Sequence, residues 1–259
     1  MSAPAPSGNV SAVMTTTVVP GKLVTPRDKS LVASEAATRL AAILRAAVAE
    51  RGSATLALSG GNTPRDAYAL LAREPGIDWG KVQVFWVDER AVSPTDDRSN
   101  YHWAKLTLLD VAAIPAHHVH RMEADDSDLE AAATRYEESL RGNVATTSGL
   151  PAFDAMVLGI GDDGHTASLF PGEPTVDVRD RLVATARPAP GREARMTLTA
   201  PVIENASHVL VLVVGAGKRP ALERAWDVQG DLHQTPSRLV RQCRGEVTWI
   251  VDRAAAGLD

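Results

Sequence analysis

Short apolar runs alternate with longer amphipathic segments along most of this chain. Leu40 and Leu44 recur on one face of a helix predicted over residues 34–51, with Ser34 as its N-cap and Gly52 as its stop. Further helices are predicted to open at Thr63–Pro64, with Thr63 as the cap, and to cover residues 99–109, 128–141 and 218–226. Strands are predicted over residues 55–58, 82–87, 153–159, 209–214 and 247–251.

The order of these elements predicts the fold class. Strands separated by helices form βαβ units, so we expect a mainly parallel sheet flanked by helices. Residues 1–30 are expected to comprise a disordered N-terminal segment and a first strand, and residues 31–259 a single α/β domain. Residues 187–195 are rich in proline and charge and should form a surface loop, whereas residues 143–151 are a weaker linker candidate.

The composition narrows the class of protein. Of the 259 residues, 44% are hydrophobic and 23% charged, which supports a substantial core. The net charge of −5 argues against nucleic acid or an anionic membrane as the main partner, although a pocket can still be locally basic. No apolar run approaches the roughly 20 residues of a membrane span. The single cysteine, Cys243, excludes an intrachain disulfide and favours a reducing, cytoplasmic location.

Residues 59–64, Ser-Gly-Gly-Asn-Thr-Pro, form the first segment with candidate chemistry. Gly60 and Gly61 let the backbone turn tightly and bring N–H groups toward a ligand. The helix that follows adds unpaired N–H donors and a partial positive charge, which suit a phosphate. Ser59 and Thr63 can add hydroxyl donors. An ordinary strand-to-helix turn explains the same residues equally well, so phosphate binding is one of two open interpretations.

A second polar segment, Asp88-Glu89-Arg90, follows the strand predicted over residues 82–87. In open α/β sheets, ligands bind beyond the carboxyl ends of the strands. Two acids and an arginine at this position could orient polar atoms of a substrate. A salt-bridged strand end is the simpler interpretation and, for this segment alone, the favoured one.

The third segment, residues 159–172, matches the dinucleotide pattern G-x-G-x-x-G. We reject that interpretation because Asp162 and Asp163 would place negative charge where a pyrophosphate needs positive potential. A glycine turn that carries Asp-Asp-Gly-His is instead typical of a mounted imidazole. Asp163 can fix the tautomer of His165 for acid–base chemistry, and a purely structural histidine is the less favoured alternative.

Two cations near strand ends complete the candidate chemistry, namely Arg195 and Lys218. Taken singly, each is more typical of a solvated surface residue than of a functional one. His117, His118 and His120 have metal-like spacing, but no nearby cysteine or carboxylate pattern completes a site, so no metal is expected.

Taken together, these segments resemble the 6-phosphogluconolactonase family. The resemblance extends over about residues 31–251 and rests on residues 59–64, 88–90, 97–100, 159–172, 195–199 and 215–218. The block Asp-Gly-His-Thr-Ala-Ser-Leu-Phe-Pro-Gly is the most specific part. Glucosamine-6-phosphate deaminases are similar in fold, but they carry Asp-Glu-Tyr in place of residues 88–90 and Ile-Ala-Phe-Asn-Glu-Pro in place of residues 166–171. Both differences favour the lactonase.

The resemblance implies a fold, an activity and a setting. The fold would be a Rossmann-like, mainly parallel sheet shared with deaminases and ribose-5-phosphate isomerases, which makes residues 31–259 the catalytic domain. The activity would be hydrolysis of 6-phospho-D-glucono-1,5-lactone to 6-phospho-D-gluconate, in the oxidative pentose phosphate pathway. No residue demands a metal or an organic cofactor. The expected partner is the phosphorylated lactone alone, and the expected assembly is a monomer or small homo-oligomer.

Roles for single residues follow from this resemblance as hypotheses. His165 would remove a proton from water, Asp163 would orient His165, and N–H groups or Arg90 would stabilise the oxyanion. The substrate-binding residues would be Ser59, Gly60, Gly61, Thr63, Asp88, Glu89, Arg195 and Lys218. Two alternatives remain, an amino-sugar phosphate deaminase or isomerase, and a non-catalytic sugar-phosphate sensor. A sensor would keep the phosphate loop but would not need His165 in an acidic turn.

Overall fold

A six-stranded parallel sheet forms the centre of the molecule. The computed structural model describes residues 17–258. The strand order is β1-β11-β10-β7-β2-β3, and every neighbouring pair is parallel. These strands are β1 (Lys22–Val24), β2 (Ala54–Leu58), β3 (Val82–Trp86), β7 (Ala155–Gly159), β10 (His208–Val213) and β11 (Glu246–Val251). Apart from β1, they are almost wholly buried, as expected for a parallel sheet covered on both faces.

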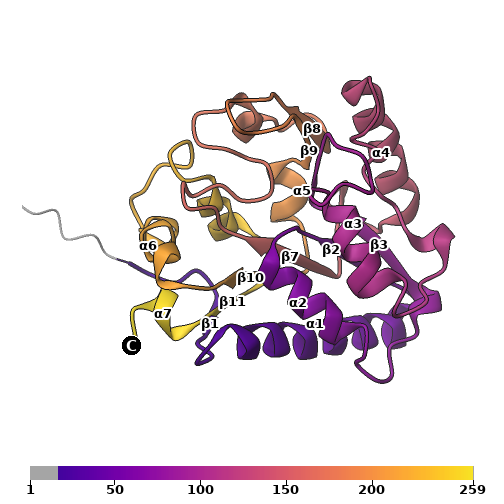
Figure 1. The fold of residues 1–259 in the computed structure, drawn as a ribbon, viewed down its shortest axis with the longest axis horizontal. Helices are drawn as coiled ribbons and strands as arrows, with labels where there is room; N and C mark the ends of the chain where they lie inside the picture. The colour runs from indigo at the N-terminus through magenta and orange to yellow at the C-terminus, as the bar shows by residue number, and fades with distance from the viewer. Residues whose placement is uncertain (1–16, 259) are drawn as a thin grey trace, which may run out of the picture.

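Helices flank this sheet and confirm the predicted fold class (Figure 1). They are α1 (Lys29–Arg51), α2 (Asn62–Leu71), α3 (Asn100–Ala104), α4 (Leu129–Asn143), α5 (Ala200–Glu204), α6 (Arg219–Trp226) and α7 (Arg253–Ala256). Short turns of 3-10 helix are η1 (Trp79–Lys81), η3 (Ala116–His118), η4 (Pro174–Asp177), η5 (Ala216–Lys218) and η6 (Pro236–Gln242), and η2 (Lys105–Leu109) is a π-helix. Helix α1 lies along the sheet and contacts β2, β7, β10 and β11.

Two predicted helix caps are wrong, for identifiable reasons. Helix α1 begins at Lys29 because the Asp28 carboxylate accepts a hydrogen bond from the N–H of Leu31, so Ser34 lies inside the helix. Helix α2 begins at Asn62, and its N-cap is Gly61 rather than Thr63. Gly61 has φ 111°, a conformation that favours glycine. The turn is therefore completed at Gly61, and the helix begins at Asn62, before Thr63 can act as the cap.

A second, antiparallel sheet was not predicted. It contains β4 (Asp88–Arg90), β9 (Arg195–Leu198) and β8 (Val183–Ala186), in the order β4-β9-β8. Strand β8 packs against α4, beside the main sheet in Figure 1. This sheet joins residues 88–90 directly to residues 195–197, far apart in sequence, and so brings two predicted site segments together. The region predicted as a weak linker contains a small hairpin of β5 (Thr146–Thr147) and β6 (Leu150–Pro151).

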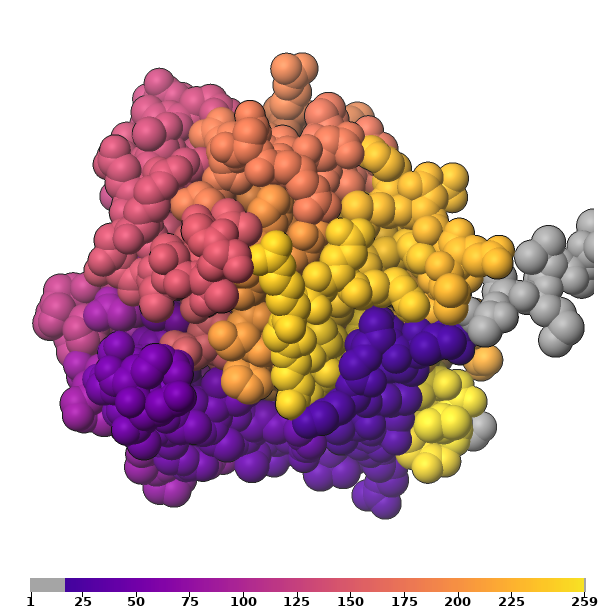
Figure 2. Space-filling view, turned by 180° about the vertical axis from the view of Figure 1, so that it is seen from behind, coloured from indigo at the N-terminus to yellow at the C-terminus, as the bar shows by residue number. Residues whose placement is uncertain are grey.

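The start and the end of the described chain lie side by side. Strand β1 pairs with β11, and Figure 2 shows the N-terminal segment, in indigo, against the C-terminal segment, in yellow. Helix α1 and strands β2, β3, β7, β10 and β11 contribute side chains to one hydrophobic core. The disorder expected for the N-terminal segment concerns residues 1–16, which lie outside the described residues. Within the described part, no helix is both long and apolar enough to cross a membrane.

Candidate active site

The loops that follow β2, β3, β7 and β10 meet at one edge of the sheet, because parallel strands present their carboxyl ends together. A cavity of about 210 Å³ lies there. Its lining includes the predicted residues Ser59, Gly60, Gly61, Asp88, Arg90, His165, Arg195 and Lys218, together with Gly159, Ile160, Gly161 and Ala167. The structure thus brings most of the predicted residues to one place. Their roles stay predictions, and Thr63, Glu89 and Asp163 do not line the cavity.

The glycine loop forms one wall of the cavity. A side chain at Gly60 would lie 1.8 Å from Oδ1 of Asn100, so the bare backbone is required there. The hydroxyl of Tyr68 donates to the carbonyl oxygen of Ser59 and accepts from its N–H, both at 3.0 Å, which fixes the loop. The hydroxyl of Ser59 is buried without a hydrogen-bond partner among the described residues. A buried, unpaired donor that lines a cavity is suited to a polar ligand.

His165, which also lines the cavity, is held by its own turn. Its Nδ1 lies 2.6 Å from Oδ1 of Asp163, and its backbone N–H donates to the same oxygen at 3.0 Å. This contact fixes the ring orientation and leaves Nε2 as the nitrogen that can exchange a proton with a ligand. Burial raises the pKa of Asp163, but hydrogen bonds and the charge of His165 outweigh burial and lower it overall. Asp163 is therefore ionised at neutral pH.

Gly161 makes this arrangement possible. A Cβ atom at Gly161 would lie 2.0 Å from Nδ1 of His165 and 2.6 Å from Oδ1 of Asp163. The N–H of Gly161 also donates to the carbonyl oxygen of His165 at 2.9 Å, which closes the turn. Sequence reasoning assigned the glycines of this segment only to turn formation, and the steric conflict could not be seen without coordinates.

Phe170 supports the site from behind the cavity. Its ring centroid lies 4.7 Å from that of His165, and the guanidinium carbon of Arg195 lies 5.8 Å above the phenyl ring. The guanidinium carbon of Arg192 lies closer, at 3.9 Å. A single buried ring thus contacts both the imidazole and a cation of the site. Sequence analysis quoted Phe170 within a motif but gave it no role.

Asp88 and Arg195 form a buried charged pair at the base of the cavity. Their side chains approach to 3.7 Å, and Asp88 also accepts hydrogen bonds from Ser168 Oγ at 2.6 Å and Asn100 Nδ2 at 3.2 Å. Burial lowers the pKa of Arg195 whereas Asp88 raises it, and an arginine remains cationic at neutral pH. Ser168 and Asn100 lie in segments that sequence analysis singled out, but their contacts with Asp88 were missed.

Glu89 does not face the cavity, which corrects its predicted substrate-binding position. The side chain is 3% exposed. Its oxygens accept hydrogen bonds from the N–H groups of Arg90, Asn100 and Tyr101 and from the hydroxyl of Ser99, at 2.7–3.0 Å. Burial raises the pKa of Glu89, and these hydrogen bonds oppose the increase. Glu89 thus anchors the start of α3 through N–H and hydroxyl donors, rather than through the salt bridge considered from the sequence, and its four acceptor positions are occupied.

Of the remaining predicted residues, Thr63 lies outside the cavity lining, whereas Lys218 and Arg90 belong to it. Thr63 lies in the first turn of α2, outside the cavity lining, because the helix starts two residues earlier than expected. Lys218 lines the cavity, and its ammonium lies 2.7 Å from Oδ1 of Asp162, which is 82% exposed. Arg90 lines the cavity too, donates to the carbonyl oxygen of Arg98, and has a buried Nε without a partner among the described residues.

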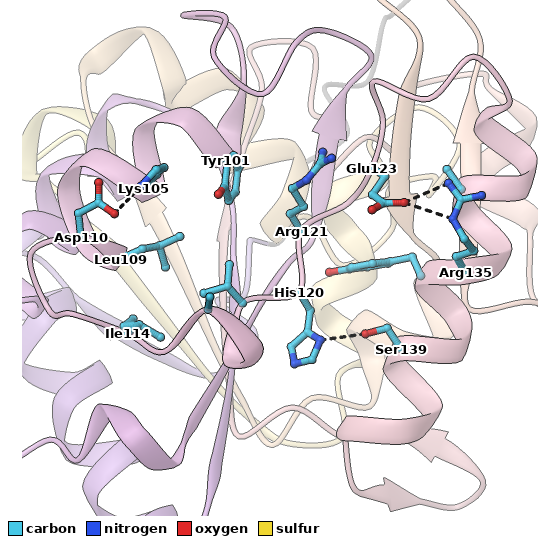
Figure 3. A pocket seen from close by; sticks show the side chains of 14 residues that line it. Tyr101, Lys105, Leu109, Asp110, Ile114, His120, Arg121, Glu123, Arg135 and Ser139 are labelled. Atoms are coloured by element: carbon cyan, nitrogen blue, oxygen red, sulfur yellow. Dashed lines mark hydrogen bonds and ion pairs between the residues drawn. The ribbon is translucent and has the colours of Figure 1, made fainter.

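A larger cavity of about 550 Å³ lies beyond β3, between α3 and α4. Figure 3 shows three pairs among its polar side chains, namely Lys105 with Asp110, Arg135 with Glu123, and His120 with Ser139. None of the predicted site residues lines it. The smaller cavity is therefore the better candidate, because it combines unpaired polar groups with a hydrogen-bonded imidazole and three cations.

Comparison with known proteins decides the family. Residues 27–249 match the family described as glucosamine-6-phosphate isomerases/6-phosphogluconolactonase. The chain belongs to this family. Within it, the chain is 43% identical to a 6-phosphogluconolactonase from Synechocystis, over 81% of this chain and 86% of that protein. It is 37% identical to a 6-phosphogluconolactonase from Streptomyces coelicolor, over 91% of this chain and 93% of that protein.

Solved structures of family members agree with this placement. The 6-phosphogluconolactonase from Trypanosoma cruzi superposes with a TM-score of 0.81 at 28% identity, covering 94% of this chain and 98% of that one. A monomeric glucosamine-6-phosphate deaminase superposes with a TM-score of 0.76 at 22% identity, covering 92% of this chain and 100% of that one. The second likeness concerns the fold alone.

Proposed function

We propose that this protein is a 6-phosphogluconolactonase, which hydrolyses 6-phospho-D-glucono-1,5-lactone to 6-phospho-D-gluconate. The observation that carries the proposal is the His165–Asp163 contact of 2.6 Å at a cavity that also contains Arg90, Arg195 and Lys218. This set supplies a base, an oxyanion partner and cations for a phosphate within a single cavity. The relatives of highest identity reported above are named as lactonases, which supports the same choice.

A lactone is an activated ester, so a bound water is a sufficient nucleophile and no covalent intermediate is needed. The water oxygen forms a bond to the carbonyl carbon while its proton moves to Nε2 of His165. The bond from that carbon to the ring oxygen then breaks, and the proton passes from His165 to the departing ring oxygen. The carboxylic acid so formed ionises in water. Asp163 keeps the imidazole oriented throughout and stabilises its protonated form.

The remaining residues bind charge that is present or develops during the reaction. Arg90 would stabilise the negative charge on the carbonyl oxygen, because its Nε is buried and unpaired among the described residues. The phosphate would lie on residues 59–61, near the start of α2, with Arg195 and Lys218 as counter-charges. Holding the phosphate fixes the carbonyl carbon relative to His165, which is how remote binding contributes to rate.

The defining experiment compares two substrates with the pure protein. Lactone hydrolysis should exceed the spontaneous background, which must be subtracted because the uncatalysed reaction is appreciable. Glucosamine 6-phosphate should release no ammonia. Comparable ammonia release would favour the deaminase alternative, and tight binding without turnover of either compound would favour a sensor. We further propose a cytoplasmic setting without nucleic-acid partners, which rests on the single cysteine and the acidic net charge.

A further inference from the structure

A second cavity adjoins the catalytic one on the far side of the glycine loop. It has a volume of about 310 Å³. Ser59, Gly60, Gly61 and Arg90 line both cavities, so the two chambers share a wall and are adjacent at Arg90. The second chamber also contains Arg65, on the first turn of α2. The roles proposed above involve the shared wall but not Arg65, which lines this chamber and not the other.

Two of the arginines that line this chamber, Arg65 and Arg90, lack carboxylate partners in the described part of the chain. Among residues 17–258, neither Arg65 nor Arg90 lies within ion-pair distance of an acid. Arg98, in contrast, is paired with both Asp96 and Glu193, although it lines the same chamber. One acid lines the chamber, Asp97, and its side chain is 88% exposed to solvent. Cations without counter-charge at a cavity are suited to an anionic ligand.

Arg65 is also held in place before any ligand arrives. Its guanidinium carbon lies 3.7 Å from the ring centroid of Trp103, a cation–π contact. Its Nη2 donates to the Asn62 side chain, and the indole N–H of Trp103 donates to the carbonyl oxygen of Asp97 at 2.6 Å. A guanidinium fixed in this way loses little conformational freedom on binding an anion, which favours affinity.

We propose that the chamber between Arg65 and Arg90 is a carboxylate subsite that binds the open-chain sugar acid formed by hydrolysis. The proposal rests on the lactonase function given above. The lactone is neutral at its carbonyl carbon, and a carboxylate exists there only after the ring has opened. Opening also converts a compact ring into an extended chain with a phosphate at one end and the new carboxylate at the other. Arg90 lines both chambers, so the carboxylate can turn away from His165 toward Arg65.

The test compares two ligands that differ only at this end of the molecule. One is 6-phospho-D-gluconate, and the other is D-glucitol 6-phosphate, which has a hydroxymethyl group in place of the carboxylate. Dissociation constants are measured by titration calorimetry for wild type and for Arg65→Gln. We expect Arg65→Gln to raise the dissociation constant of 6-phosphogluconate by about tenfold. The dissociation constant of glucitol 6-phosphate should change by no more than about twofold. Arg73→Gln is the matched control, since Arg73 lies exposed just beyond α2 and should change neither constant.

Two further variants separate charge from packing. Arg65→Lys keeps the cation and should restore part of the lost affinity, whereas Trp103→Leu removes the ring beneath Arg65 and should reproduce a milder loss. Equal weakening of both ligands by Arg65→Gln would make Arg65 a phosphate contact and overturn the proposal. The proposal would also be overturned if Arg65→Gln raised the KM for the lactone as much as it raised the dissociation constant of the product. It would likewise be overturned if Arg65→Gln left the dissociation constant of the product unchanged. If wild type fails to hydrolyse the lactone, the proposed function itself fails, which is a different outcome.

Discussion

Nδ1 of His165 lies 2.6 Å from Oδ1 of Asp163, and these two residues are separated in sequence by Gly164 alone. The backbone N–H of His165 donates to the same carboxylate oxygen, so a single acid fixes both the main chain and the ring. Gly164 has φ 94°, which a residue with a side chain rarely adopts. One short segment therefore supplies the proposed base, the proposed orienting acid and the turn that holds them.

Asp163→Asn should lower kcat by roughly tenfold, less than the loss expected for removal of the histidine, because it disturbs ring orientation without removing the base.

The pKa of Asp163 is lowered in the fold, so its carboxylate favours the native state at neutral pH. That contribution is present above the unfolded pKa and is lost as pH falls through the lowered, folded pKa. Steady-state kinetics and acid unfolding of the variant and wild type check both parts. An Asn variant with wild-type kcat would show that Asp163 does not position the ring.

Gly161→Ala should reduce kcat by about 100-fold or more, because the new Cβ would displace both His165 and Asp163 from the distances given above. Gly142→Ala is the control. No atom lies within 4 Å of a Cβ at Gly142, which is in α4, so helix propensity should leave stability unchanged or raise it by up to about 1 kcal/mol. Kinetics with circular dichroism distinguish a displaced dyad from an unfolded protein. Normal turnover by Gly161→Ala would contradict the geometry.

Lys218→Ala should weaken binding of the phosphorylated lactone by about tenfold, corresponding to about 1.4 kcal/mol. This is the low end for a charge-assisted contact, because Lys218 is partly exposed and already paired with Asp162. Arg195→Ala should cost more, since it also leaves buried Asp88 without its cation. KM values for phosphorylated and unphosphorylated glucono-1,5-lactone provide the readout. An equal loss with both lactones would mean that these cations do not contact the phosphate.

Glu89→Gln should destabilise the fold by about 1–3 kcal/mol, because an amide cannot accept all the hydrogen bonds that the carboxylate now accepts from residues 90 and 99–101. Urea unfolding monitored by circular dichroism measures the change in the free energy of unfolding. The KM for lactone should change less than stability does. A variant with unchanged stability and a strongly raised KM would return Glu89 to the substrate-binding set.

The sequence predicted the parts of this fold that depend on local patterns. Apolar strands and intervening helices indicated a parallel sheet, and its carboxyl edge placed the segments around Gly60, Asp88 and His165 together. The antiparallel sheet was missed because its strands have three or four residues and include polar side chains, too short for a periodic signal. Asp28 was missed as a cap because Ser34, which is also a favoured N-cap residue type, lies further along the same helical pattern.

Contacts between distant segments were beyond sequence reasoning. Neither the approach of Asn100 to Gly60 nor the position of Phe170 behind His165 has a local signature. The burial of Glu89 outside the cavity lining was not predicted for the same reason. Its charge and its place after a strand suggested a ligand contact, whereas the donors that occupy it come from α3, ten residues and more along the chain.

The most direct test of the central claim is the turnover of His165→Gln. Glutamine can still donate and accept hydrogen bonds but cannot take a proton from water, so kcat for the lactone should fall by about 10²–10⁴-fold. Binding of 6-phosphogluconate, measured by calorimetry, should remain, because the proposed phosphate and carboxylate contacts lie on other residues. A folded His165→Gln protein that keeps most of the wild-type kcat above the spontaneous background would contradict the general-base role of His165.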